Sequence, residues 1–367
     1  MRGTTVVRSL PSAVCCLLSV MFLIGMRAGD AEAIAARDTK IGTTFSKKQC
    51  EYLGLDWRET YGKVLEMGFD YMRLGAYWSE IERREGVYDF SQLDEQINKA
   101  GEKGIPVILT VGMKAPRWPE YYIPEWVTEN GGVKPGGDVG KNAYLRRKVL
   151  EFIERAVDRY QDDRTVVMWQ VENEPMNLFG GKSWHIGKDL LEKEIAVVRE
   201  TDEKGRKILL TSATYPNIFL RMAQKASLRY DPAKECLALC DVIGLNVYPG
   251  IGQKILGISL YLDADKKSRA KYFNGLFSRI RPSGKEIWIT ELQAEPWEPV
   301  KLVYTGEKTP KTADPEDTLE YFREFRNEGI DTIFLWGAEY WVFRAERYGD
   351  LSWYGILEEM RREAEKP

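Results

Sequence analysis

The chain has 367 residues, of which 44% are hydrophobic and 12% aromatic, so it can bury the core of one large domain or of two ordinary ones. The formal net charge is −3 and no strongly basic stripe stands out, which excludes an electrostatic argument for a nucleic-acid partner.

The amino-terminal segment reads as a targeting signal. Arg2 and Arg8 precede an apolar run over residues 10–25, and Ala31-Glu32-Ala33 offers a cleavage site with small residues at its first and third positions. We interpret residues 1–33 as a secretory signal peptide and expect the mature protein to be secreted or periplasmic, without a membrane partner. An uncleaved anchor is the alternative, although the apolar run is short for a full membrane span.

Short apolar or β-branched runs bounded by turns recur along the rest of the chain and predict eight strands. Between them lie stripes of apolar residues at helical spacing, for example over 93–100, 149–157 and 319–325. No linker rich in Pro, Gly or Ser divides the chain, so residues 34–367 are expected to form one α/β domain, a (β/α)8 TIM barrel. The expected strands are 39–45, 71–75, 106–111, 166–171, 208–211, 242–247, 287–290 and 332–336.

A doubly wound open sheet is the competing architecture. It normally carries a glycine-rich phosphate loop after its first strand, but Thr43-Thr44-Phe45-Ser46 stands at that place. The barrel is therefore favoured.

A barrel places its catalytic side chains at the carboxyl ends of the strands, and two apolar strands end there in carboxylates. "WQVENEP", residues 169–175, carries Glu172 and Glu174 after the fourth expected strand, and "IWITE", residues 287–291, ends in Glu291 at the seventh. Strand alternation turns Glu172 away from Asn173, so Glu172 is interpreted as a neighbour of the site. Glu174 and Glu291 form the candidate pair.

Two carboxylates on facing strands suit glycoside hydrolysis. One protonates the leaving oxygen, while the other attacks the anomeric carbon or activates water. Arg73 and Tyr248, at the ends of the second and sixth strands, could orient the attacking carboxylate by charge-assisted and neutral hydrogen bonds. Asn173 could bind the sugar 2-hydroxyl, and Trp336 could form an apolar floor under the ring.

Further tryptophans follow strands three, four, seven and eight and are candidates for stacking against sugar rings. Trp118 and Trp297 are preferred as substrate-binding residues because each lies in a Pro-bounded loop just past a strand. About half of the set is expected to serve ordinary packing instead. The set comprises Trp118, Trp126, Trp184, Trp297, Trp341 and Trp353.

Asn-Glu-Pro at 173–175 and Thr-Glu at 290–291 resemble the two signatures of clan A of the glycoside hydrolases, which are retaining β-glycosidase barrels. The resemblance implies that Glu174 is the acid/base and Glu291 the nucleophile of a double displacement, with no metal and no cofactor. Asn246 stands where family 5 of this clan usually carries a His before the Tyr.

Within the clan, the chain resembles two families in different respects. "YMRLGAYWSEIERREGVYDFSQLDEQINKAGEKGIPVIL", residues 71–109, followed by "APRWPEYY", residues 115–122, is similar to the second and third barrel units of family 42 β-galactosidases. The length of the single domain is more like family 5 cellulases and mannanases, and an outlying family of the clan also fits. An enzyme of the endo-β-glucanase or mannanase type is favoured, and an exo-acting β-galactosidase or β-glucosidase is the alternative.

Two functions of other classes compete with this hypothesis. A non-catalytic carbohydrate-binding barrel requires a lost carboxylate, yet both are present. A metal-dependent hydrolase requires several His or Asp ligands at strand ends, but the chain has a single His, His185. Cys236 and Cys240, one helical turn apart, are interpreted as two buried thiols.

Overall fold

The computed structural model describes residues 38–130, 132–178, 181–227, 230–255, 257–299 and 310–365. The expected signal peptide, residues 1–33, lies outside these ranges. Among the described residues, no helix is both long enough and apolar enough to cross a membrane.

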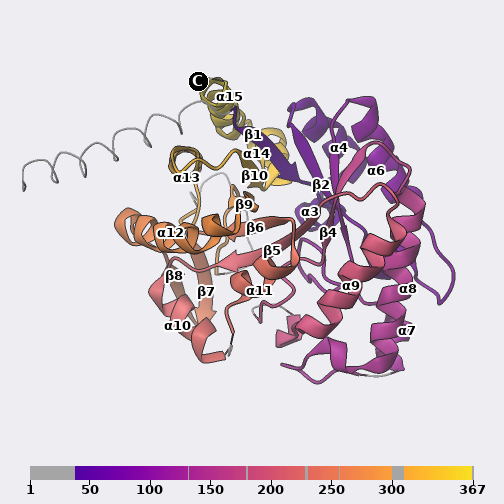
Figure 1. Ribbon diagram of the computed structural model, residues 1–367. Helices are drawn as coiled ribbons and strands as arrows, with labels where there is room; N and C mark the ends of the chain where they lie inside the picture. The colour runs from indigo at the N-terminus through magenta and orange to yellow at the C-terminus, as the bar shows by residue number, and fades with distance from the viewer. Residues whose placement is uncertain are drawn as a thin grey trace, which may run out of the picture.

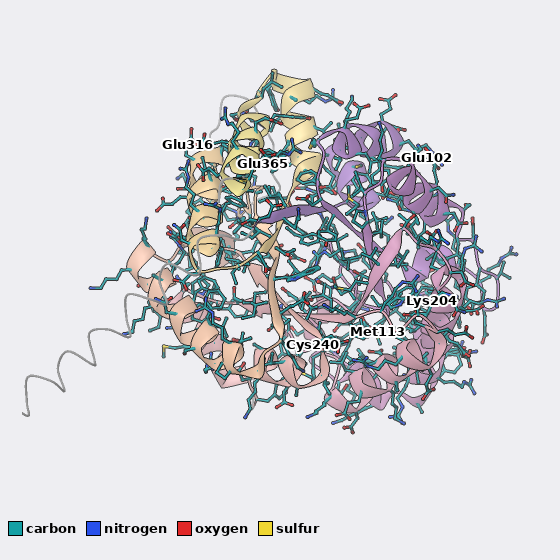
Figure 2. All side chains as sticks on the ribbon, turned by 45° about the horizontal axis from the view of Figure 1, so that its top comes forward. Glu102, Met113, Lys204, Cys240, Glu316 and Glu365 are labelled. Carbon is teal, nitrogen blue, oxygen red and sulfur yellow. The ribbon has the colours of Figure 1, made fainter. Side chains whose placement is uncertain are left out.

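Eight parallel strands close into a barrel that is surrounded by helices (Figures 1 and 2). Around the barrel the order is β1-β10-β9-β6-β5-β4-β3-β2, and the first strand pairs with the last. This closure confirms the predicted (β/α)8 barrel and excludes the open sheet. The barrel strands are β1 (Lys40–Thr44), β2 (Tyr71–Gly75), β3 (Val107–Val111), β4 (Val166–Val171), β5 (Ile208–Thr214), β6 (Val242–Val247), β9 (Glu286–Gln293) and β10 (Thr332–Trp336).

Four of these strands have the bounds that the sequence predicts, and two run well past their predicted ends. Strands β5 and β9 are longer because residues after their expected ends, up to Thr214 and Leu292, remain paired with β6. A two-stranded antiparallel hairpin, β7 (Ile251–Ile255) and β8 (Ile258–Leu262), was not predicted and is inserted after β6.

The helices pack apolar faces onto the outside of the barrel. Helix α8 shows how: a residue in every third or fourth position from Leu145 to Tyr160 is buried, and Asn142 caps the helix by accepting from the N–H of Leu145. The helices are α3 (Lys47–Leu53), α4 (Trp57–Glu66), α5 (Trp78–Ile81), α6 (Ser91–Glu102), α7 (Glu125–Glu129), α8 (Ala143–Tyr160), α9 (Lys188–Thr201), α10 (Ile218–Ser227), α11 (Pro232–Leu239), α12 (Lys266–Ile280), α13 (Pro315–Asn327), α14 (Ala338–Tyr348) and α15 (Ser352–Ala364), with short 3-10 turns η1 (Val139–Lys141), η2 (Gly181–Ser183) and η3 (Arg281–Ser283).

The barrel interior changes from apolar to polar along the strand direction. Side chains two residues apart on a strand share a face. The residue two positions after an inward-facing apolar residue therefore also faces inward, nearer the carboxyl end of the strand. Thus Arg73 follows Tyr71, and Gln170 follows Met168. The barrel interior is therefore filled by an apolar layer towards the amino ends of the strands and carries polar groups towards their carboxyl ends. The buried apolar layer comprises Ile108, Met168, Leu209, Val242, Trp288 and Phe334.

The packing of this apolar layer can be tested by adding one methyl group. A Cβ at Gly42 of β1 would lie 2.6 to 2.8 Å from three ring atoms of Phe334, which is fully buried. Gly42→Ala should therefore lower the free energy of unfolding by about 1–3 kcal/mol, measured by urea denaturation. The control is Gly62→Ala, within helix α4, where nothing lies within 4 Å of the added Cβ. An equal or higher stability of Gly42→Ala than of Gly62→Ala would contradict the packing described.

Cys50, Cys236 and Cys240 are buried free thiols, which confirms the interpretation of Cys236 and Cys240 as two buried thiols.

Candidate active site

Glu291 lies near the carboxyl end of β9, where that strand carries an extra residue relative to both neighbours. Ile289 and Leu292 pair with Ile333 and Leu335 of β10, so β9 has one more residue than β10 between these two pairs. The register of β9 against β6 shifts by one residue at the same place. Such a bulge redirects a side chain, and here it lies at Thr290 and Glu291.

Two donors hold the Glu291 carboxylate. Arg73 Nη2 lies 2.5 Å from Oε1, and the Tyr248 hydroxyl donates to Oε2 at 2.5 Å. Arg73 is itself fixed, since its Nε donates to Thr44 Oγ1 at 2.8 Å and its Nη1 to Gln170 Oε1 at 3.3 Å. The structure therefore brings Arg73 and Tyr248 to Glu291, as the sequence analysis expected.

Glu174 lies in a strained turn directly after β4. Glu172 and Glu174 have φ of 60° and 46°, in the left-handed region that non-glycine residues seldom adopt. Surrounding contacts hold the turn in this conformation: the Glu174 N–H donates to Thr211 Oγ1 at 2.8 Å, and its carbonyl accepts from Lys114 Nζ at 2.9 Å. Strain of this kind persists only where the neighbourhood fixes the backbone, and it is typical of functional sites.

Two amides orient the Glu174 carboxylate. Asn246 Nδ2 donates to Oε1 at 2.8 Å, and Asn177 Nδ2 donates to Oε2 at 2.7 Å. Asn246 is oriented in turn because its Oδ1 accepts from the Thr290 hydroxyl at 2.7 Å. Asn246 is also the residue of β6 that pairs with Glu291 of β9. A single amide thus connects the two carboxylate-bearing strands.

Asn173, between the two left-handed residues, is oriented through its Oδ1 atom. This atom accepts from Gln170 Nε2 and from the Thr211 hydroxyl, both at 3.2 Å. Asn173 is almost fully buried beside Glu174.

Burial dominates the electrostatics of Glu291. It raises the pKa of Glu291 to about 7, and the nearby charge of Glu174 adds to the increase, while Arg73 and Tyr248 oppose it. The group is therefore poised to change protonation near neutral pH.

Glu172 is a support for the turn, in agreement with its interpretation as a neighbour. Its carboxylate is fully buried and accepts from the backbone N–H groups of Met113 and Lys114 at 2.8 and 2.5 Å. It also occupies the space beside Gly112, where a Cβ would lie 2.2 Å from the carboxylate oxygen. Glu172 therefore fixes the loop after β3 against the turn after β4.

The aromatic candidates divide into site and packing residues. Trp336 ends β10 and is 7% exposed, and its ring centroid lies 6.3 Å from that of Tyr248. Trp297, 43% exposed, has its ring 5.3 Å from Tyr248 in an edge-on arrangement. Trp118 is 69% exposed on the loop after β3. Trp336 and Trp297 therefore both lie next to Tyr248, which donates to Glu291.

The remaining tryptophans serve packing. Trp341 and Trp353 are buried and stack at 5.7 Å. Trp126 packs edge-on against Trp78, and the indole N–H of Trp184 donates to backbone carbonyls of the neighbouring loop. Four of the six tryptophans of the set are therefore structural, more than the expected half.

Sequence reasoning missed several residues of the site. Asn177 could have been found as an amide one turn after Glu174, and Gln170 as a polar residue inside an apolar strand. Arg117 and Glu295 gave no comparable signal, because both lie in loops whose course the sequence does not define.

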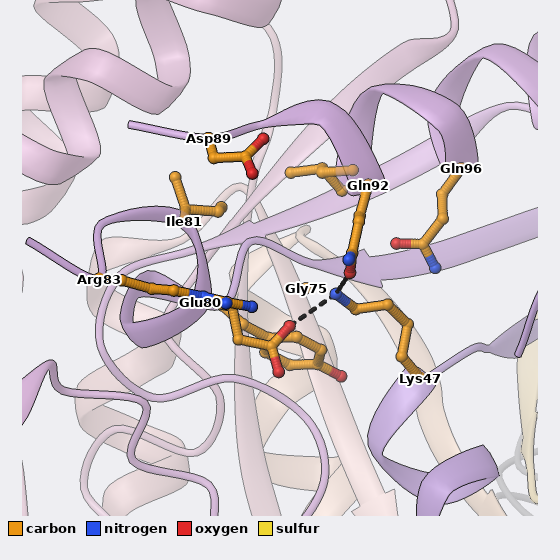
Figure 3. Close-up of a pocket in the computed structure, with 10 residues that line it drawn as sticks. Lys47, Gly75, Glu80, Ile81, Arg83, Asp89, Gln92 and Gln96 are labelled. Carbon is orange, nitrogen blue, oxygen red and sulfur yellow. Dashed lines mark hydrogen bonds and ion pairs between the residues drawn. The ribbon is translucent and has the colours of Figure 1, made fainter. Parts of the chain in front are cut away.

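A depression between α3, α5 and α6 is a separate feature (Figure 3). Lys47 Nζ donates there to Glu80 Oε2 at 2.6 Å and to Gln92 Oε1 at 2.5 Å. Its central charges are therefore paired with each other, and none of the site residues predicted from the sequence lines it.

Comparison with known proteins finds a similarity over one part of this barrel, which includes β2, β3 and β4. Residues 52–181 match the family model of glycoside hydrolase family 42, described as β-galactosidase. The resemblance to clan A glycoside hydrolases is confirmed. The matched region includes Arg73, Asn173 and Glu174 but ends before Tyr248 and Glu291.

Among curated proteins, the β-galactosidase Bga of Halorubrum lacusprofundi is 29% identical over 128 residues, which make up 32% of this chain and 18% of that enzyme. The chain thus matches less than a fifth of that relative's length.

Solved structures extend the likeness to the whole barrel. The cold-adapted β-galactosidase of Rahnella sp. R3 superposes with a TM-score of 0.59 at 15% identity, over 90% of this chain and 58% of that one. The xylanase 10B of Thermotoga maritima superposes with a TM-score of 0.54 at 17% identity, over 92% of this chain and 98% of that one. At such identities the likeness shows the fold alone, a (β/α)8 barrel.

Proposed function

We propose that this chain is a retaining β-glycosidase that removes single sugars from the ends of β-linked glycosides, with β-galactosides as the first substrates to test. The observation that carries the proposal is the arrangement of two buried carboxylates, Glu174 directly after β4 and Glu291 on β9, which are joined through Asn246. Glu174 is the acid/base and Glu291, held by Arg73 and Tyr248, is the nucleophile.

The exo-acting alternative is preferred here to the endo-glucanase or mannanase type that the sequence analysis favoured. The reason is the match of residues 52–181, since both the family model and the relative from Halorubrum lacusprofundi are named β-galactosidases. Export by the segment 1–33 remains part of the proposal and is tested by N-terminal sequencing of the mature protein.

Each residue has a defined task in this mechanism. The Glu291 carboxylate attacks the anomeric carbon while Glu174 gives its proton to the leaving oxygen, which forms a glycosyl-enzyme ester. Glu174 then takes a proton from water, which attacks the anomeric carbon and releases the sugar with its configuration retained. Trp336 packs against the sugar ring, and Asn173 binds its 2-hydroxyl.

The proposal is tested by assaying the purified protein against aryl β- and α-glycosides of galactose, glucose, mannose and xylose, and against β-linked polysaccharides. We expect hydrolysis of β-glycosides with galactosides preferred, no action on α-glycosides, and single sugars as products. Oligosaccharide products from a polysaccharide would instead support the endo-acting type. Inactivity on every glycoside would contradict the proposal.

The raised pKa of Glu291 predicts how activity depends on pH. The nucleophile reacts only as the carboxylate, so on the acid side kcat/KM should rise about tenfold per pH unit up to about pH 7. Because the charge of Glu174 contributes to raising this pKa, Glu174→Gln should move the acid limb to lower pH when the substrate has a good leaving group. An acid limb at the same pH in both proteins would contradict the electrostatic coupling.

Arg73→Ala should lower kcat/KM by about 10²- to 10³-fold, comparable to losing one transition-state donor. Arg73 lowers the pKa of Glu291, so its removal should also move the acid limb to higher pH. The matched control is Arg269→Ala, which removes another buried Arg, paired with Glu324 outside the site. If Arg73→Ala kept the wild-type pH profile while folded, Arg73 would have no part in controlling Glu291.

A further inference from the structure

A cluster of buried charges lies at the rim of the barrel beside Trp336, outside the catalytic pair. Arg117, on the loop after β3, binds Glu295, on the loop after β9, through Nη1 to Oε1 and through Nη2 to Oε2 at 3.2 Å. The same Nη2 lies 3.4 Å from Oε2 of Glu339, in the first turn of α14. Arg117 and Glu295 keep 8% and 10% of their side chains exposed, whereas Glu339 is fully buried.

This cluster and the arginine that binds the nucleophile lie against the same aromatic ring. The Arg117 guanidinium lies 4.1 Å from the centroid of the Trp336 ring, and that of Arg73 lies 5.8 Å from the same centroid. Arg73 in turn binds Glu291. Arg117, with Glu295 bound to it, therefore lies beside the tryptophan that the proposed function packs against the sugar.

The neighbouring segments hold the cluster rigidly. Gln49 Nε2 donates to Glu295 Oε2 at 3.0 Å, and the Ser46 N–H donates to Glu339 Oε1 at 2.6 Å. Arg117 has a φ of 88°, which is strained for a residue with a side chain. Burial of such charges contributes little to stability, because desolvation offsets most of the attraction. A rigid and strained arrangement of this kind is better explained by binding than by stability.

The charges indicate which chemical groups the cluster can accept. One guanidinium faces two carboxylates, so the cluster has a formal excess of negative charge and an anionic sugar would be repelled. The buried Nε atom of the Arg117 guanidinium has no hydrogen-bond partner among the described residues. The exposed edge of Glu295 can accept from a hydroxyl, and the guanidinium can donate to a hydroxyl oxygen. Neutral hydroxyl groups therefore fit this edge best.

We propose that Arg117 and Glu295 bind the hydroxyls of the sugar that lie farthest from its anomeric carbon, on C4 or C6, and so select the sugar that is cleaved. The inference rests on the proposed glycosidase function and deepens it.

The test pairs a variant with substrates that lack one hydroxyl. We would measure kcat/KM of the wild type and of Glu295→Gln on the preferred aryl β-glycoside and on its 4-deoxy and 6-deoxy analogues. In the wild type, one of the two analogues should react about 10- to 100-fold more slowly, because a hydrogen bond to a charged group is lost. In Glu295→Gln the parent substrate should slow by a similar factor, and the penalty for that deoxy analogue should shrink to about threefold or less.

A matched control and a second variant complete the design. Asp94→Asn, which breaks the exposed Arg159–Asp94 pair on the outer helices, should leave every rate and both penalties unchanged. If Glu295→Gln does not fold, Arg117→Lys serves in its place, since Lys keeps the charge but loses the two-pronged contact with Glu295.

The outcomes separate the two proposals. Equal deoxy penalties in the wild type and the folded variant would overturn the assignment of Arg117 and Glu295 while leaving the glycosidase function intact. A wild type that is inactive on every aryl glycoside would instead contradict the proposed function, and this inference with it.

Discussion

Glu291→Ala is expected to abolish hydrolysis, with kcat falling by about 10⁴- to 10⁶-fold on every β-glycoside, as for the removal of a central catalytic group in other hydrolases. Without this carboxylate no glycosyl-enzyme can form, and Arg73 and Tyr248 are left facing an empty position. The rate would be measured with an aryl β-glycoside, and the fold by circular dichroism.

The control lies on the same strand. Glu286 is the first residue of β9, and its carboxylate pairs with exposed Lys207 at the opposite end of the barrel. Glu286→Ala removes this carboxylate and should keep wild-type turnover. If folded Glu291→Ala retained more than about a hundredth of wild-type activity, Glu291 would not be the nucleophile.

Glu174→Ala is expected to have a large effect that depends on the leaving group. An activated aryl substrate needs no protonation, so it should still form the glycosyl-enzyme, whereas an unactivated glycoside should lose about 10²- to 10⁴-fold in kcat/KM. Azide needs no general base, so it should attack the intermediate and restore turnover with a β-glycosyl azide as product. In Glu291→Ala, azide can instead occupy the place of the missing carboxylate and give the α-azide.

The configuration of the two azides, read by proton NMR at the anomeric centre, assigns the roles. Should Glu174→Ala give the α-azide and Glu291→Ala the β-azide, the roles of the two residues would be exchanged. Full activity of both variants without azide would remove the pair from catalysis.

The barrel and the backbone of its site could be predicted from the sequence because their signals are local. Each strand is a short apolar run bounded by turns, and the site residues are the polar groups at which these runs end. Arg73, Glu174 and Glu291 could be assigned to one face of the molecule before the structure was known, because parallel strands of a barrel end on the same side.

The remaining features depend on contacts between distant segments. Arg117 and Glu295 are 178 positions apart in sequence and meet only because the loops after β3 and β9 converge over Trp336. The bulge that redirects Glu291 comes from the register of β9 against β6 and β10, which the composition of β9 does not reveal. The choice between endo and exo action also depends on such loops, whereas the sequence analysis favoured the endo type on the length of the single domain.

The central claim is that Glu291 forms a covalent bond to the sugar, and it is tested most directly by trapping that intermediate. An activated 2-deoxy-2-fluoro β-glycoside reacts to form the ester but slows its hydrolysis, because fluorine destabilises the positively charged transition state. Mass spectrometry of the intact protein should show one added fluoro-sugar, located after digestion on the peptide that contains Glu291. Glu291→Gln should take up no label. Attachment to another carboxylate, or hydrolysis of the natural substrate with inverted anomeric configuration and no label, would contradict the account.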